Sequence, residues 1–192
     1  MKSFNKRDFQ PFAGDSSLQK HFIDICQDHN IDTIIETGTY VGGSTKEFAK
    51  MAKNVITIEH ELEYFQHASL YLSGIKNIEM IYGSSISHLK KCIEKASGNL
   101  LFFLDAHWGP NNPLLGELDI IKKSGVKPII GIHDMKNPNH PEYAYDTYGS
   151  ITYEWDWIKN SVEAIYGNNY EIKYNDNAVG VNKVGVIFIF PS

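Results

Sequence analysis

Two short stretches pair an acidic residue with a histidine directly after an apolar run. The first, FLDAHWGP, contains Asp105, His107 and Trp108, and the second, GIHDMKNP, contains His133 and Asp134. A lone histidine is more often a hydrogen-bonded core residue than a functional one. Here two acid–histidine pairs follow two successive predicted strands, and the carboxyl ends of adjacent parallel strands lie side by side. We therefore predict a functional site in which two carboxylates and two imidazoles converge.

A glycine-rich stretch, IIETGTYVGGST, follows an earlier apolar run. It reads E-x-G-x-x-x-G-x-S from Glu36 to Ser44, with glycines at 38, 42 and 43. Glycines allow a tight turn and let the backbone approach a ligand closely. The spacing differs from the G-x-G-x-x-G fingerprint of dinucleotide-binding proteins. Ser44 and Glu47 are spaced as a capping box, which predicts a helix that starts at Ser44. A plain turn between strand and helix is the alternative.

Polar residues also end the next two predicted strands. Glu59 ends NVITIE, at the place where an acid can accept hydrogen bonds from both ribose hydroxyls. An acid in isolation would more often be a solvated charge. The third strand ends in YGSS, so that Gly83, Ser84 and Ser85 can cap the next helix or contact an adenine edge.

Strands and helices alternate along the chain. Apolar runs predict strands at 33–36, 54–59, 77–82, 100–105, 128–133, 169–174 and 184–190. Apolar residues at helical spacing predict helices around 18–26, 86–96, 114–121 and 151–165. This alternation predicts a mostly parallel sheet that is covered on both faces. The loop NDNAVGVNK joins the last two strands without a helix, which predicts an antiparallel hairpin.

In their order and spacing, IIETGTYVGGST, VITIEHE, NIEMIYGSS and LLFFLDAHW resemble motifs I to IV of class I S-adenosylmethionine-dependent methyltransferases. The resemblance covers about residues 30–190. It implies an α/β fold with a Rossmann-like, doubly wound sheet of seven strands, order 3-2-1-4-5-7-6, with strand 7 antiparallel. It also implies that the glycines admit the methionine end of the cofactor. The cofactor-binding residues would be Glu36, Gly38, Thr39, Tyr40, Gly42, Ser44, Glu59, Ser84, Ser85 and Asp105.

The two acid–histidine stretches resemble the corresponding parts of metal-assisted O-methyltransferases of the catechol, macrolide-sugar and cephalosporin-tailoring types. This resemblance implies a divalent metal, magnesium or manganese, that is bound by Asp105, His133 and Asp134 and acidifies the acceptor hydroxyl. His133 stands where that family usually has a carboxylate, and imidazole suits manganese, iron or zinc better than magnesium. His107 would remove the proton as general base; a metal-free variant would use His107 or His133.

Aromatic residues crowd the segment 136–157. Tyr143, Tyr145, Tyr148 and Tyr153 fall in a stretch punctuated by proline and glycine, where core packing explains them less well than it explains Trp155 on the helical stripe. Loops at this edge of a sheet commonly carry function. Their rings, with Asp146 nearby, would suit a sugar or another polyhydroxylated acceptor. A lid that makes no substrate contact is the alternative.

The composition indicates a single globular domain, 1–192. Residues 1–30 form an N-terminal segment and helix, and 136–157 form a substrate-side loop. A net charge of −5 argues against broad binding to nucleic acid or anionic membrane. No apolar run approaches the roughly 20 residues of a membrane span, and the N-terminus lacks the apolar core of a signal peptide. Cys26 and Cys92 share no motif, which indicates reduced cysteines in a cytoplasmic protein.

The leading function is methyl transfer from S-adenosylmethionine to a hydroxyl of a small-molecule acceptor. A nicotinamide-dependent oxidoreductase is an alternative that the glycine spacing disfavours, and a non-catalytic relative that binds S-adenosylmethionine is another. The sequence leaves open the acceptor, the metal and the oligomeric state, a homodimer included.

Overall fold

The computed structural model describes residues 4–107 and 112–192, so Trp108 lies outside the described residues. Within them, seven strands form one sheet in the order β3-β2-β1-β4-β5-β9-β8. Within this sheet, the pairings of β9 with β5 and β8 are antiparallel and the other pairings are parallel. The predicted fold class and strand order are confirmed. The strands are β1 (Ile31–Thr37), β2 (Asn54–Glu59), β3 (Ile78–Tyr82), β4 (Asn99–Leu104), β5 (Ile129–Ile132), β8 (Tyr170–Tyr174) and β9 (Ile187–Pro191).

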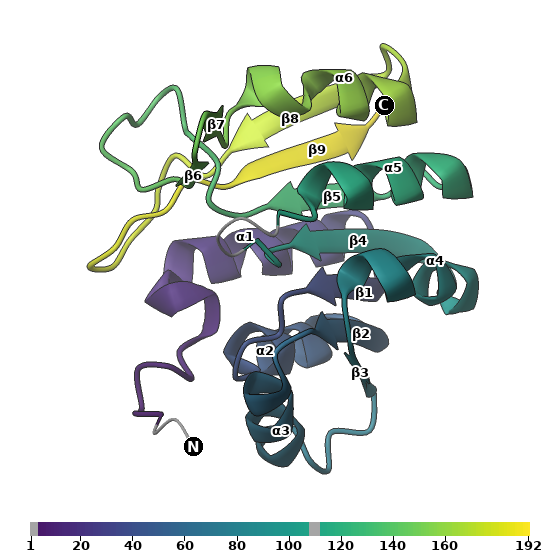
Figure 1. Ribbon diagram of the computed structural model, residues 1–192, viewed down its shortest axis with the longest axis vertical. Helices are drawn as coiled ribbons and strands as arrows, with labels where there is room; N and C mark the ends of the chain where they lie inside the picture. Colours follow the sequence, from purple (N-terminus) through teal and green to yellow (C-terminus); the bar gives the residue numbers. More distant parts are fainter. Residues whose placement is uncertain (1–3, 108–111) are drawn as a thin grey trace.

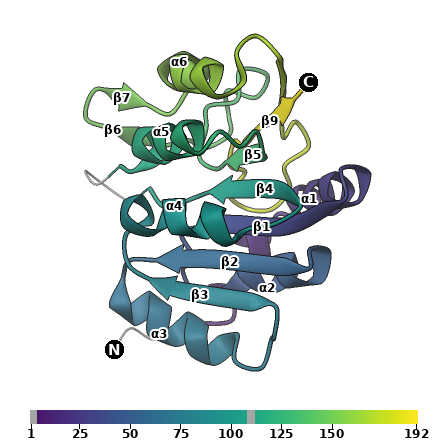
Figure 2. The same ribbon diagram turned by 90° about the vertical axis from the view of Figure 1, so that its right-hand side faces the viewer.

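Helices cover both faces of the sheet (Figure 1). On one face, α1 (Ser16–Asp28) and α2 (Gly43–Met51) contribute to one apolar cluster. On the other face, α4 (Ser85–Lys95), α5 (Leu114–Ser124) and α6 (Trp155–Tyr166) contribute to a second one. Helix α3 (Leu62–Tyr71) lies beside β3 at the sheet edge (Figure 2). No helix in the described part of the chain is long and apolar enough to cross a lipid bilayer.

The central strands are mostly apolar because both of their faces are buried. Ile34 and Phe103 pack in the cluster with α1 and α2, whereas Ile35 and Phe102 pack in the cluster with α4, α5 and α6. Successive side chains of a strand point to opposite faces, so a sheet that is covered on both faces favours apolar residues on both sides of each strand.

Two helix starts differ from their predictions. Helix α2 begins at Gly43, its N-cap is Gly42 with a φ of 89°, and the predicted capping box is wrong. The hydroxyl oxygen of Ser44 instead accepts a hydrogen bond of 2.9 Å from the backbone N–H of Phe12 in the N-terminal segment. Ile151, predicted on a helix, lies in the short hairpin of β6 (Thr147–Tyr148) and β7 (Ile151–Thr152), and α6 starts only at Trp155.

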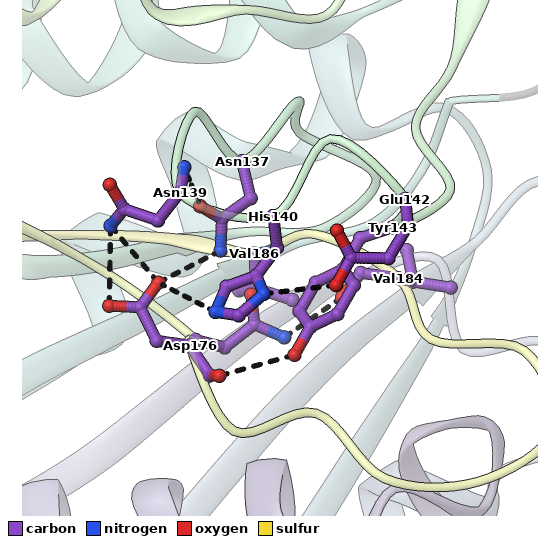
Figure 3. A network of polar contacts seen from close by, with 9 residues as sticks. Asn137, Asn139, His140, Glu142, Tyr143, Asp176, Val184 and Val186 are labelled. Carbon is purple, nitrogen blue, oxygen red and sulfur yellow. Dashed lines mark hydrogen bonds and ion pairs between the residues drawn. The ribbon is translucent and has the colours of Figure 1, made fainter.

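The segment between β5 and β6 is tied to the connection between β8 and β9 (Figure 3). The carboxylate of Asp176 accepts hydrogen bonds from the side-chain amides of Asn137, at 3.1 Å, and Asn139, at 3.2 Å. The hydroxyl of Tyr143 donates to the carbonyl oxygen of Asp176, and His140 stacks on the Tyr143 ring. Tyr143 is buried rather than presented to an acceptor, and so is Tyr153. The expectation that packing explains these two tyrosines poorly is wrong.

Candidate functional site

The glycines of the turn after β1 each have a neighbour inside the protein. Gly38 has a φ of 89°, and a Cβ there would lie 2.3 Å from the carbonyl oxygen of Asp105. A Cβ on Gly42 would meet the side chain of Leu72 at 2.9 Å, and one on Gly43 would meet the backbone of Phe9 at 2.8 Å. Close packing within the chain therefore accounts for these glycines without a cofactor. The contact of Gly38 also sets the β1 turn against the residue that follows β4.

Glu36 lies inside the protein between β1, α2 and β2. Its Oε2 accepts hydrogen bonds from the hydroxyls of Thr45, at 2.5 Å, and Thr57, at 2.7 Å. The hydroxyls of Thr57 and Thr39 lie 2.6 Å apart. Burial raises the pKa of Glu36 to about 8, although the two hydroxyls act in the opposite direction. Glu36 thus joins three elements, and its contact with a cofactor stays a prediction.

Glu59 ends β2, as predicted, and fixes the neighbouring turns. Its Oε2 accepts a 2.7 Å hydrogen bond from the N–H of Tyr40, and its Oε1 accepts a 2.8 Å bond from the N–H of Glu61. Burial raises the pKa of Glu59, and these backbone N–H groups lower it. Each carboxylate oxygen can accept a second hydrogen bond. The acid that would hold a ribose is therefore already oriented by the turn after β1.

The serines after β3 have separate surroundings. Ser84 is the N-cap of α4, but its side chain makes no capping hydrogen bond. Ser85 is buried and, with Thr37, faces the carboxyl of Glu117 on α5. Burial raises the pKa of Glu117, while both hydroxyls lower it. Sequence analysis missed Glu117 as a buried residue. Its helical spacing from Leu114 and Leu118 places it on the buried face of α5 and could have indicated this.

Asp105, His107, His133 and Asp134, here called the acid–histidine cluster, come together at the ends of β4 and β5. His133 Nδ1 lies 3.3 Å from Asp105 Oδ1 and 3.1 Å from Asp134 Oδ2. His107 Nε2 lies 3.2 Å from Asp134 Oδ2. The exposed fraction of the side chain is 31% for Asp105 and 24% for Asp134 but only 1% for His107. The predicted convergence is confirmed, and the carboxylates form its open side.

Charge and backbone conformation single out Asp134 and His133. Asp134 has a φ of 57°, which is uncommon for a residue other than glycine and is often found at functional sites. Burial opposes its ionisation, but His133 and His107 bring the pKa of Asp134 well below its ordinary value. Burial likewise disfavours a charged His133, yet Asp105 and Asp134 raise its pKa well above the usual range. Despite these short distances, His133 Nδ1 makes no well-aligned hydrogen bond with the described residues.

The β6–β7 hairpin brings Asp146 to the cluster, although the sequence predicted Asp146 only as a contact of the acceptor substrate. The backbone N–H of Asp146 donates a 3.0 Å hydrogen bond to the carbonyl oxygen of Asp134. The hydroxyl of Tyr148 faces both the carboxylate of Asp146 and the carbonyl oxygen of His107, the latter at 3.2 Å. Tyr153 packs its ring against His107, with centroids 4.6 Å apart. The hairpin therefore closes over His107.

The ligand set suits a divalent cation. Asp105, His133 and Asp134 can each offer one atom such that all three atoms lie within 4.8 Å of one another, and so can His107, Asp134 and Asp146. The first group is the predicted metal site, and the buried Nδ1 of His133 lies close to both carboxylates of that group. Mixed imidazole and carboxylate donors favour manganese, iron or zinc over magnesium. The residues thus fit a metal, and its presence stays a prediction.

No protein-family model and no curated protein sequence matches this chain. Solved structures do match. The O-methyltransferase TomG from Streptomyces achromogenes, in complex with S-adenosylmethionine, is 15% identical with a TM-score of 0.64; the match covers 91% of this chain and 79% of that one. An O-methyltransferase from Bacillus cereus, in complex with S-adenosylhomocysteine, is 13% identical with a TM-score of 0.59, covering 91% and 81%.

A third match is precorrin 8w decarboxylase from Methanobacterium thermoautotrophicum, which is 16% identical with a TM-score of 0.58, covering 92% of this chain and 90% of that one. At such low identity the likeness concerns architecture, and one fold can host different reactions. Together with the strand order, these comparisons show that the chain has the Rossmann-like fold of S-adenosylmethionine-dependent methyltransferases.

Proposed function

We propose that this protein transfers a methyl group from S-adenosylmethionine to a hydroxyl of a small-molecule acceptor. One observation carries the proposal: the acid–histidine cluster lies at the ends of β4 and β5, directly beside the Gly38 turn of β1. In folds of this kind, ligands bind beyond the carboxyl ends of the strands. A cofactor over the turn would place its methyl group next to groups that can bind and activate a hydroxyl.

The cofactor would lie across the ends of β1, β2 and β3. Glu59 would accept hydrogen bonds from the ribose, since its two oxygens are held in place by the N–H groups of Tyr40 and Glu61. The Ser84 hydroxyl makes no capping bond and would face the adenine side. Two proteins of this fold were solved in complex with S-adenosylmethionine or S-adenosylhomocysteine, which supports the choice of cofactor.

The acceptor would meet the carboxylates of the cluster. Asp105 and Asp134 are its more exposed members, so they can orient an incoming hydroxyl. A divalent cation held by Asp105, His133 and Asp134 would acidify that hydroxyl. The ring of His107 is covered, and its Nε2 faces Asp134, so in this conformation it acts on the carboxylate. Its role as general base stays a prediction.

Calorimetric titration with S-adenosylhomocysteine, and with NAD in parallel, tests the cofactor. Glu59→Ala should weaken S-adenosylhomocysteine binding by about 1–3 kcal/mol, as expected for lost hydrogen bonds to a charged group. Glu61→Ala is the matched control because its side chain faces His60 at the surface. Tight binding of NAD without binding of S-adenosylhomocysteine would overturn the proposal in favour of an oxidoreductase.

Asp105→Ala tests the chemistry. We expect it to abolish methyl transfer to a competent acceptor while cofactor affinity stays nearly unchanged, because the carboxylate lies on the acceptor side. Exhaustive chelation should have the same effect on turnover. Activity that survives both treatments would remove the metal from the mechanism and leave a histidine as the base.

A further inference from the structure

We propose that the site has a second cation position, formed by His107, Asp134 and Asp146, beside the position formed by Asp105, His133 and Asp134. Asp134 belongs to both groups. The β6–β7 hairpin would thus complete a two-cation centre. Binding to the second position can be tested without the proposed function, whereas its purpose, to assist activation of the acceptor hydroxyl, rests on that function.

The geometry of the second group matches that of a mononuclear ligand set. One imidazole nitrogen and two carboxylate oxygens lie within 4.8 Å of one another, which fits a cation at about 2.0–2.4 Å from each atom. His107 is nearly inaccessible, which suits a metal ligand better than a base that must reach an acceptor. Two positions that share a carboxylate can lie about 3.5–4 Å apart, as in two-metal sites.

The charges around the position call for a cation. Three carboxylates, from Asp105, Asp134 and Asp146, converge, and no Lys or Arg in the described residues pairs with any of them. Residues 108–111, with the sequence WGPN, add no charge. Like charges so close to one another repel unless a proton or a cation offsets them. The two histidines can offset part of this repulsion, and a divalent ion at each position would offset it more fully.

The surroundings of the second group resemble the outer shell of a metal site. Tyr148 directs its hydroxyl to the carboxylate of Asp146, and the Asp146 N–H holds the carbonyl oxygen of Asp134. Such outer hydrogen bonds orient the ligands of metal centres. These hydrogen bonds join Tyr148 of the hairpin and Asp146, which directly precedes it, to Asp134 beyond the end of β5, so folding of the hairpin brings the ligands together.

An unpartnered hydroxyl gives independent evidence for a ligand here. Tyr153 is fully buried, its ring packs on His107 and lies 5.7 Å from that of Tyr148, and its hydroxyl makes no hydrogen bond to the described residues. These two ring contacts set Tyr153 beside His107, a member of the second group, and beside Tyr148, which bonds to Asp146. Buried hydroxyls almost always have a partner. A water molecule on a bound cation would supply one.

Manganese serves as the probe, with the full chain first stripped of metal by a chelator. Equilibrium dialysis should find two Mn²⁺ per chain, and electron paramagnetic resonance should show a spin-coupled pair. Asp146→Asn should retain one Mn²⁺ with an uncoupled signal. Asp119→Asn, a change on the exposed side of α5 where Asp119 pairs with Lys123, should retain both ions.

A single Mn²⁺ in the unaltered chain, or two in Asp146→Asn, would overturn the proposal. Circular dichroism checks the fold of each variant, and His107→Gln provides a second route if Asp146→Asn does not fold. Titration with S-adenosylhomocysteine separates the two proposals. Two bound ions without cofactor binding would refute the methyltransferase proposal alone, whereas cofactor binding with only one ion would refute the second position alone.

Discussion

Glu36 is the least expected residue of the core, because its carboxyl group is buried and contacts two threonine hydroxyls. Glu36 has no basic partner among the described residues, and its pKa is raised to about 8 by burial. Between its ordinary pKa of 4.5 and this value, the folded chain keeps a proton that the unfolded chain has lost. The contribution of Glu36 to the free energy of unfolding therefore falls as pH rises, by about 1.4 kcal/mol per pH unit.

Replacing this acid by its amide should remove that dependence. In Glu36→Gln the amide oxygen can still accept from Thr45 and Thr57 but never ionises, so the variant should gain stability over the original chain as pH rises from 5 to 8. Urea unfolding at several pH values measures the difference. Parallel pH dependences for the two proteins would show that Glu36 ionises normally in the fold.

Gly38 offers a sharper test of packing. Gly38→Ala combines a left-handed backbone with a Cβ placed 2.3 Å from the Asp105 carbonyl oxygen, so we expect a loss of more than about 2 kcal/mol. Gly74→Ala is the matched control, because Gly74 has a φ of 91° and no neighbour within 4 Å of the added Cβ. Its free energy of unfolding should fall only by the roughly 1–2 kcal/mol that a left-handed backbone conformation costs a residue with a Cβ. Equal losses in thermal or urea unfolding would contradict the close approach.

The positions of site residues could be predicted from the sequence where the residue directly follows a strand of the sheet. Asp105 and His107, like His133 and Asp134, follow strands that are neighbours in the sheet, so their meeting could be predicted. Asp146 could not be predicted as a member of the group, since its place depends on a hydrogen bond from its own backbone N–H to the carbonyl oxygen of Asp134, 12 residues earlier in the chain. The surroundings of Glu36 were equally hidden, because they depend on which hydroxyls of α2 and β2 face it.

At the scale of elements, the hydrogen bonds to Asp176 hold the segment that leads to the hairpin. Asp176→Ala removes the acceptor of Asn137 and Asn139, so the amides of residues 137–146 should exchange faster with deuterium. Global stability should change by only about 1 kcal/mol, because the carboxylate is near the surface. Glu171→Ala on β8, an exposed acid beside Lys173, is the control. Unchanged exchange would mean that the backbone of the segment is held without this carboxylate.

Elements with a strong apolar pattern were predicted well, whereas helix α3 and the start of α2 were not. All seven sheet strands were found within a few residues of their bounds, because each carries apolar side chains that lie in one of the two apolar clusters or pack against it. Helix α3 buries only Ala68, so it leaves no stripe to recognise. The start of α2 was misplaced because Gly42 supplies the required left-handed turn while Ser44 bonds to the N-terminal segment.

For the molecule as a whole, the last strand of the sheet occupies an internal position, next to the edge strand β8. β9 lies between β5 and β8, and its Ile187, Phe188 and Ile189 are fully buried. A chain that ends before Val186 should therefore fail to fold cooperatively, as judged by circular dichroism and urea unfolding. A chain without Ser192 alone should behave normally. A cooperative transition in the shorter chain would show that β8 and α6 can pack on β5 without β9.

The position of β9 also has a consequence during biosynthesis. Roughly 60 residues separate β5 from the end of β9, and at about 5–20 residues per second their translation takes several seconds. Throughout that interval the edge of β5 has no partner from its own chain, and unpaired edges can join those of other molecules. A nascent chain stalled within this window would be a natural client for chaperones at the ribosome, and emergence of β9 would complete the sheet.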